Sequence, residues 1–141
     1  MSIQYISVNL IAHFSNGNKV PHDLFLGKLL SDKTNYEHIK SKKVWQSAQI
    51  IFFKIELNKF KDEEEPNESY IEEIKKELEL SSKWLNSIPN QIFKDFLKTG
   101  LNIKIFISSW IDSDQFDLDI PSSFIKACSE KELSFSIITN E

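Results

Sequence analysis

Residues 4–14 read QYISVNLIAHF, a run in which apolar side chains alternate with mostly polar ones. Ile6 and Val8 share one parity, and Ser7 and Asn9 share the other. Side chains of a β-strand point alternately to the two faces of its sheet, so this run predicts a strand with one buried and one open face. Strands buried between two helix layers would show continuous apolar runs instead. The segment therefore predicts a sheet that carries helices on one face only.

The same pattern extends along the rest of the chain. Three further strand-like runs alternate with three mainly helical stretches, and neither a repeat nor a change of composition marks a second domain. The order is β-α-β-α-β-α-β. It predicts a single domain over residues 1–141 of the α/β class, an α+β two-layer sandwich with a four-stranded, mostly antiparallel or mixed sheet. The predicted strands are residues 4–14, 45–57, 101–108 and 133–137, and the predicted helices are residues 21–30, 69–98 and 121–131.

Local signals predict several boundaries of these elements. Ser69 and Glu72 have the Ser-x-x-Glu spacing of a capping box, in which each side chain bonds a free backbone amide of the other residue, so a helix is predicted to begin there. Pro89 is expected to interrupt this helix, and Gly100 is expected to end its second piece in a left-handed conformation. The polar residues 31–43 show no clear period, which predicts a loop.

Composition and charge disfavour several classes of function. The chain has a net charge of −4, and its basic residues are 17 lysines with no arginine. Bidentate recognition of guanine or phosphate relies on the arginine guanidinium, so nucleic-acid binding is disfavoured. No run approaches about 18 consecutive apolar residues, so no membrane span is expected. The single cysteine, Cys128, and the absence of a signal-peptide pattern after Met1 predict a cytoplasmic protein.

The reactive residues form no recognisable active-site pattern. Cys128 lies at helical spacing from apolar residues, which predicts a core position rather than a nucleophile. His13, His22 and His38 lack metal-ligand spacing, and the chain has no Gly-rich phosphate loop or catalytic serine motif. We therefore expect a protein without enzymatic activity, cofactor or metal ion.

An acidic segment follows the third predicted strand, with Asp112, Asp114, Asp117 and Asp119 placed around Phe116. Its first half is similar to the calcium loop of an EF-hand. However, Phe116 occupies the fifth position, where an oxygen ligand is required, and Asp117 stands where the turn requires glycine. A solvated acidic loop is one interpretation, and a surface that faces a basic protein is another.

Four aromatic residues, Tyr5, Phe52, Phe106 and Trp110, fall on the parity assigned to the open face of the sheet. Aromatic side chains on an exposed sheet face are candidate anchors for a partner, because aromatic residues dominate binding hot spots. The alternative interpretation is that loops or edge residues cover them.

Motifs spread along the chain are shared with one known group of proteins. They are Trp45 at the start of the second predicted strand, Gly100 before the third, and the closing segments FDLDIP at 116–121 and LSFSI at 133–137. On these features most of the chain resembles the bacterial domain-of-unknown-function family 4279, a group of small single-domain proteins. The resemblance implies no established activity, although some relatives are similar to immunity proteins of bacterial toxin systems.

These observations lead to the hypothesis of a non-enzymatic immunity protein that neutralises a bacterial toxin by direct protein–protein binding. A basic toxin domain is the candidate partner, because an acidic loop would steer its association. The alternative is a small-ligand sensor or an accessory subunit of a larger complex, and the oligomeric state and strand order stay open. The residues predicted to contact the partner are Asp112, Asp114, Phe116, Asp117, Asp119, Trp110, Phe106 and Phe52.

Overall fold

The computed structural model describes residues 5–29, 40–44, 47–56, 66–110 and 118–139. These residues form five strands and four helices in the order β1, α1, β2, β3, α2, α3, β4, α4, β5. The strands are β1 (Tyr5–Phe14), β2 (Lys40–Val44), β3 (Ser47–Glu56), β4 (Leu101–Trp110) and β5 (Ser134–Thr139). The helices are α1 (His22–Leu29), α2 (Pro66–Ser87), α3 (Asn90–Lys98) and α4 (Ser122–Glu130).

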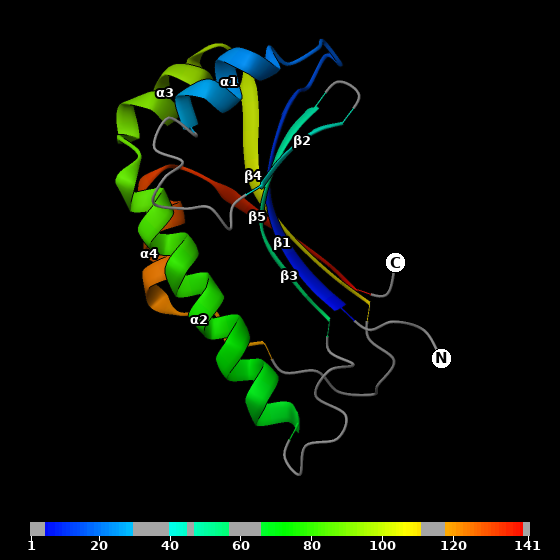
Figure 1. Ribbon diagram of the computed structural model, residues 1–141. Coiled ribbons are helices and arrows are strands. Elements are labelled where there is room, and N and C mark those ends of the chain that lie inside the picture. Colours follow the sequence, from blue (N-terminus) through cyan, green and yellow to red (C-terminus); the bar gives the residue numbers. More distant parts are fainter. Residues whose placement is uncertain (1–4, 30–39, 45–46, 57–65, 111–117, 140–141) are drawn as a thin grey trace.

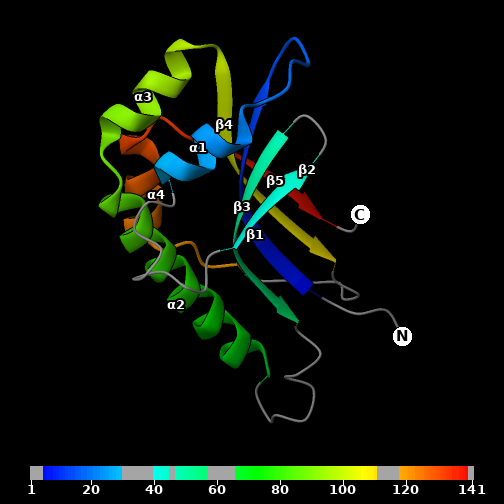
Figure 2. The same cartoon turned by 45° about the horizontal axis from the view of Figure 1, so that its top comes forward.

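The five strands form one mixed sheet in the order β2-β3-β1-β4-β5. β1 pairs antiparallel with both of its neighbours, whereas β4 and β5 pair in parallel. All four helices lie on the same side of the sheet, as Figures 1 and 2 show from two directions. The predicted two-layer α+β sandwich with helices on one face is therefore confirmed.

The prediction of four strands and of a loop over residues 31–43 was wrong in one respect. Lys40–Val44 forms a strand, β2, which pairs antiparallel with β3 from Val44 opposite Ser47 to Lys40 opposite Ile51. Its sequence KSKKV lacks the apolar alternation by which strands are found, because an edge strand is held by backbone hydrogen bonds and needs no buried side chains.

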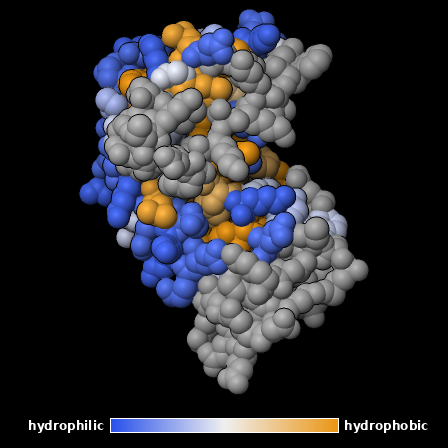
Figure 3. Space-filling model, viewed as in Figure 1, coloured by the Kyte–Doolittle hydropathy of each residue, from blue (hydrophilic) through white to orange (hydrophobic). Residues whose placement is uncertain are grey.

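The core lies between the sheet and the helix layer. Ile6, Val8 and Leu10 of β1 are fully buried and point toward the helices, as the alternation predicted. The helices contribute aromatic side chains to the same core, among them Phe25 of α1 and Phe93 of α3. In the view of Figure 3, hydrophilic residues line most of the visible outer margin of the helix layer. The buried residues of α3 are Phe93 and Phe96, as expected of an amphipathic helix that packs on a sheet.

The predicted helix ends are close to the observed ones. α2 begins at Pro66, three residues before Ser69, because proline fits the first turn of a helix, where its missing N–H has no intrahelical partner. Pro89 separates α2 from α3, and Gly100 adopts a φ of 89° between α3 and β4. Both predictions for these two residues are confirmed.

A β-bulge in β3 overturns the prediction that Phe52 lies on the open face. Val8 pairs with Phe53 and Asn9 pairs with Ile51, so Phe52 has no partner on β1. The extra residue shifts the alternation, and Phe52 and Phe53 both point to the helix side. Phe52 is 1% exposed, so it belongs to the core and cannot serve as a partner contact.

Candidate functional site

The face of the sheet opposite the helices carries no described helix and is the main candidate for a binding surface (Figure 1). The strands are bowed, with their middles nearest the helices and both ends turned away, so this open face is concave in both views. Phe106 and Trp110 of β4 lie on it, as predicted, and each is half-buried. Tyr5 of β1 lies directly opposite Trp110, and Phe106 lies opposite Asn9. Three aromatic side chains therefore lie on two central strands of one open face.

Two lysines accompany these aromatic rings. The Nζ atom of Lys54 lies 4.6 Å from the centroid of the Tyr5 ring, and that of Lys104 lies 5.6 Å from the centroid of Phe106. Both distances fall within the range of cation–π attraction. The pairs hold the ammonium groups on the open face. Glu56, opposite Tyr5, is the one acidic residue in the described strands. The strands of this face therefore offer an aromatic and mainly cationic surface.

The middle of the open face is polar. The hydroxyl of Ser7 on β1 shares a hydrogen bond of 2.8 Å with that of Ser108 on β4. Two residues further along β1, the Oδ1 atom of Asn9 is buried and has no hydrogen-bond partner among the described residues. Asn9 therefore adds a further polar side chain to the centre of this face.

The acidic part of the predicted contact set is only partly described. Asp119 is exposed in the segment that leads from β4 to α4. Asp112, Asp114, Phe116 and Asp117 lie outside the described residues. The structure thus places Phe106 and Trp110 together on the open face, removes Phe52 from it, and does not test the acidic loop as a contact.

Phe52 is held in the core by aromatic contacts that the bulge makes possible. Its ring centroid lies 5.4 Å from that of Trp84 on α2 and 6.4 Å from that of Phe124 on α4, both edge-on. Edge-to-face pairs at these separations are favourable beyond the area they bury. The ring therefore joins the two helices to the sheet.

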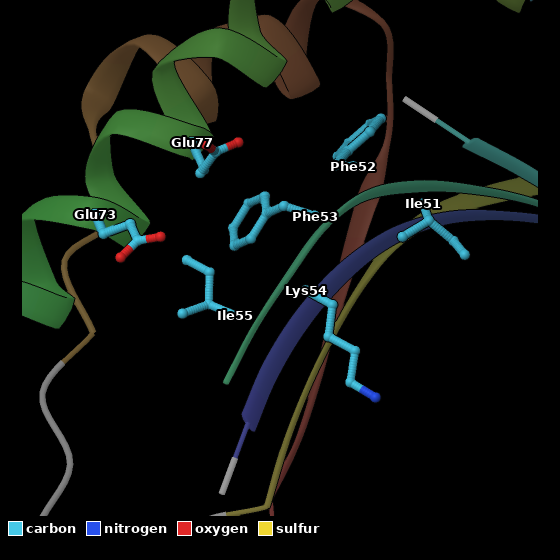
Figure 4. Close-up of a pocket in the computed structure, with 7 residues that line it drawn as sticks. All are labelled: Ile51, Phe52, Phe53, Lys54, Ile55, Glu73 and Glu77. Atoms are coloured by element: carbon cyan, nitrogen blue, oxygen red, sulfur yellow. The ribbon is translucent and has the colours of Figure 1, made fainter. Parts of the chain in front are cut away.

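A pocket that the sequence analysis missed lies beside β3 (Figure 4). It has a volume of about 410 Å³ and lies between residues 51–55 of β3 and the middle of α2. Phe53 and Ile55 point into it, with Glu73 and Glu77 of α2 facing them, whereas Lys54 points to the opposite face of the sheet. Glu73 and Glu77 are four residues apart and so share one side of the helix. That spacing was visible in the sequence, but nothing there showed that this side of α2 meets β3.

The thiol of Cys128 is the described group with the greatest potential as a nucleophile, and burial limits its reactivity. Cys128 is fully buried and free, as the helical spacing predicted, and this burial raises the pKa of its thiol to about 12, against the opposing effect of Lys131. A thiol that stays protonated is a poor nucleophile. Among the described residues, no group of three or more histidine, cysteine, aspartate or glutamate side chains could hold a metal ion. No helix in the described ranges is long and apolar enough to cross a membrane.

Comparisons with models of protein families, with curated proteins and with solved structures found no match to this chain. The resemblance to the domain-of-unknown-function family 4279 therefore stays a prediction.

Proposed function

We propose that this chain is a non-enzymatic, cytoplasmic immunity protein that neutralises a bacterial toxin by binding it directly. The observation that carries the proposal is the open sheet face with Tyr5, Phe106 and Trp110 on its central strands. Aromatic side chains supply large, rigid contact areas at interfaces, and a concave sheet face presents several of them to one partner at once.

Charge suggests different roles for the strands of the open face and for the acidic segment 112–119. Lys54 and Lys104 make the strands cationic, so the partner's contact with the strands contains acidic or aromatic groups. A basic toxin domain therefore meets the acidic segment 112–119 instead, which would speed association by steering. Asp119, at the end of that segment, is exposed and available for such a role.

The proposal is tested by a pull-down with tagged protein from the native host at low salt, so that a charge-steered complex survives. The supporting result is one stoichiometric partner with a toxic activity that this protein abolishes. Recovery of a partner whose activity is unaffected, or of no partner, counts against the immunity role.

Variants then locate the contact surface. Phe106→Ala and Trp110→Ala should each weaken binding of the recovered partner, because they remove anchors from the open face. Leu24→Ala on α1 is the matched control, since Leu24 is an exposed apolar residue on the helix layer. Equal affinities of all three variants would exclude the open face as the interface.

The pocket beside β3 favours a second candidate function, a small-ligand sensor. Its volume of about 410 Å³ lies within the range of small-molecule sites. The apolar Phe53 and Ile55 opposite Glu73 and Glu77 suit a ligand with an apolar body and a basic group. A thermal-shift screen of cationic metabolites tests this, because a ligand at 100 times its dissociation constant adds about 2.7 kcal/mol of stability.

A further inference from the structure

The two edges of the sheet differ in how they resist pairing with another chain. β2 forms one edge and carries three lysines among its five residues, KSKKV. Lysine on an edge strand opposes addition of a further strand. β5 forms the other edge and reads SFSIIT, with no charged residue and no proline. Its register with β4 runs from Ser134 to Thr139 without a bulge, so this strand lacks the charge, proline and bulge that commonly protect an edge.

The edge formed by β5 is also the main place where large apolar side chains are exposed. Four such side chains are exposed in the described ranges of the chain. Two of them, Phe135 (36% exposed) and Ile137 (57%), belong to β5. A third, Ile125 (49%), belongs to α4, the helix that packs on β5 through Phe124, whose ring centroid lies 5.9 Å from that of Phe135. No described strand pairs with the outer side of β5.

We propose that β5 pairs antiparallel with β5 of a second copy of this chain, with Ser136 on the twofold axis. The two sheets then continue into one sheet across the dimer, and the helix layers of both copies lie on the same side. Residues that sit opposite each other in an antiparallel pair must point to the same face. Phe135 and Ile137 both point to the helix side, since Phe135 lies beside Ile105 and Ile137 beside Ile107.

The choice of a second copy follows from the sequence of the strand itself. With Ser136 on the axis, Phe135 lies opposite Ile137 of the partner subunit, and this apolar pair occurs twice. A shift by one residue would place helix-side residues opposite open-face residues, which the pleat does not allow. An axis through Ile137 would place Phe135 opposite Thr139 of the partner subunit, so the contact between Phe135 and Ile137 would not form. A strand without charge also avoids the repulsion that like charges would create between two identical edges.

This interface uses the edge of the sheet, whereas the proposed toxin contact uses the open face, so the two proposals stand or fall separately. The first test is the mass of the purified full chain in solution over a dilution series. The expected result is twice the chain mass of 16.5 kDa, falling to one chain on dilution. A single chain mass at every concentration would overturn the proposal.

Matched variants locate the interface. Ile137→Lys adds a charge to the edge strand and should reduce the mass to one chain. Leu24→Lys places the same change at a similarly exposed apolar residue (54%) on α1 and should leave the dimer intact. Circular dichroism checks that both variants are folded. A folded Ile137→Lys protein that stays dimeric would contradict the assignment, and so would loss of the dimer in both variants.

A cysteine cross-link tests the register and does not depend on a destabilising change. In a Cys128→Ala background, Ser136→Cys places two thiols directly opposite each other, with Cα atoms about 4.5–5.5 Å apart, which a disulfide can span. Ile138→Cys is the control on the same face, because its copy lies four residues further along, about 13 Å away. Oxidation should give a covalent dimer for Ser136→Cys only. A covalent dimer only for Ile138→Cys, or for neither variant, would overturn the proposed axis.

Discussion

Cys128 is a buried thiol whose ionisation is coupled to folding. Burial raises its pKa from 9.0 to about 12, so between these values the unfolded chain loses a proton that the folded chain keeps. The stabilising contribution is therefore complete below pH 9 and is lost as the pH rises toward 12. At pH 10 the expected loss is on the order of 1 kcal/mol. Urea unfolding at pH 8 and pH 10 should show a smaller loss for Cys128→Ala than for the natural chain, and equal losses would contradict this assignment.

The pKa of Lys131 shifts in the opposite direction to that of Cys128. It is 3% exposed, and desolvation lowers the pKa of its ammonium group, with smaller opposing effects from Glu130 and Cys128. Nζ donates a hydrogen bond to Oδ1 of Asn90 and lies 5.8 Å from the centroid of Phe93. Because the folded chain binds this proton less tightly than the unfolded chain, the cost is present at neutral pH and disappears as the pH rises through 10.5.

Lys131→Met should therefore raise the free energy of unfolding at pH 7, because methionine retains the apolar packing without a desolvated charge. The gain should shrink as the pH approaches 11, and urea unfolding at the two pH values measures it. A gain that is the same at both values would show that the charge is not its source.

At the scale of the elements, the turn from α3 into β4 depends on one glycine. Gly100 has a φ of 89°, and a Cβ built there meets no atom within 4 Å, so the cost of a side chain would be backbone strain alone. Gly100→Ala should lower stability by about 1 kcal/mol. Gly27 in α1 has the same open surroundings without a positive φ, so Gly27→Ala should raise stability by about 0.5–1 kcal/mol. Thermal unfolding of both variants checks the contrast in sign.

The bulge in β3 makes a second contrast between two phenylalanines. Phe52 packs between Trp84 and Phe124, so Phe52→Ala should cost about 3–5 kcal/mol of stability. Phe106 lies half-buried on the open face, opposite Asn9 and with its ring centroid 5.6 Å from Nζ of Lys104, so Phe106→Ala should cost about 1 kcal/mol or less. Denaturant unfolding measures both values. Similar costs for the two variants would mean that the bulge does not direct Phe52 into the core.

At the scale of the whole molecule, β1 is the centre around which the sheet is built. It is paired on both sides, with β3 from Tyr5 to Ala12 and with β4 from Tyr5 to Phe14. Its amide hydrogens should therefore exchange most slowly, close to the rate set by global unfolding, and those of the edge strand β2 should exchange fastest among the strands. Hydrogen exchange followed by mass spectrometry tests this order. Faster exchange in β1 than in β2 would show that the sheet opens from its centre.

The sequence alone determined the class of the fold and several of its boundaries. Alternation in residues 4–14 and helical spacing around Cys128 reflect the geometry of the local backbone, so they could be recognised without knowing any neighbour. The roles of Pro89 and Gly100 could also be predicted from the sequence. Proline restricts φ and glycine permits a positive φ, and neither effect depends on neighbouring elements. The position of Phe106 and Trp110 on the open face followed from the same alternation and proved correct.

Only the tertiary structure decided that Phe52 turns inward together with its neighbour Phe53, because a bulge arises from the register between two strands and leaves no mark in the sequence of one of them. The lysine-rich β2 was missed for a related reason. It is identified by its backbone pairing with β3, and this pairing leaves no apolar alternation in the sequence KSKKV. The pocket beside β3 and the unprotected edge of β5 likewise depend on which elements end up as neighbours. The periodicity of apolar residues indicates the local backbone conformation. A binding surface is formed by segments that are distant in sequence, and the periodicity does not show which of them become neighbours.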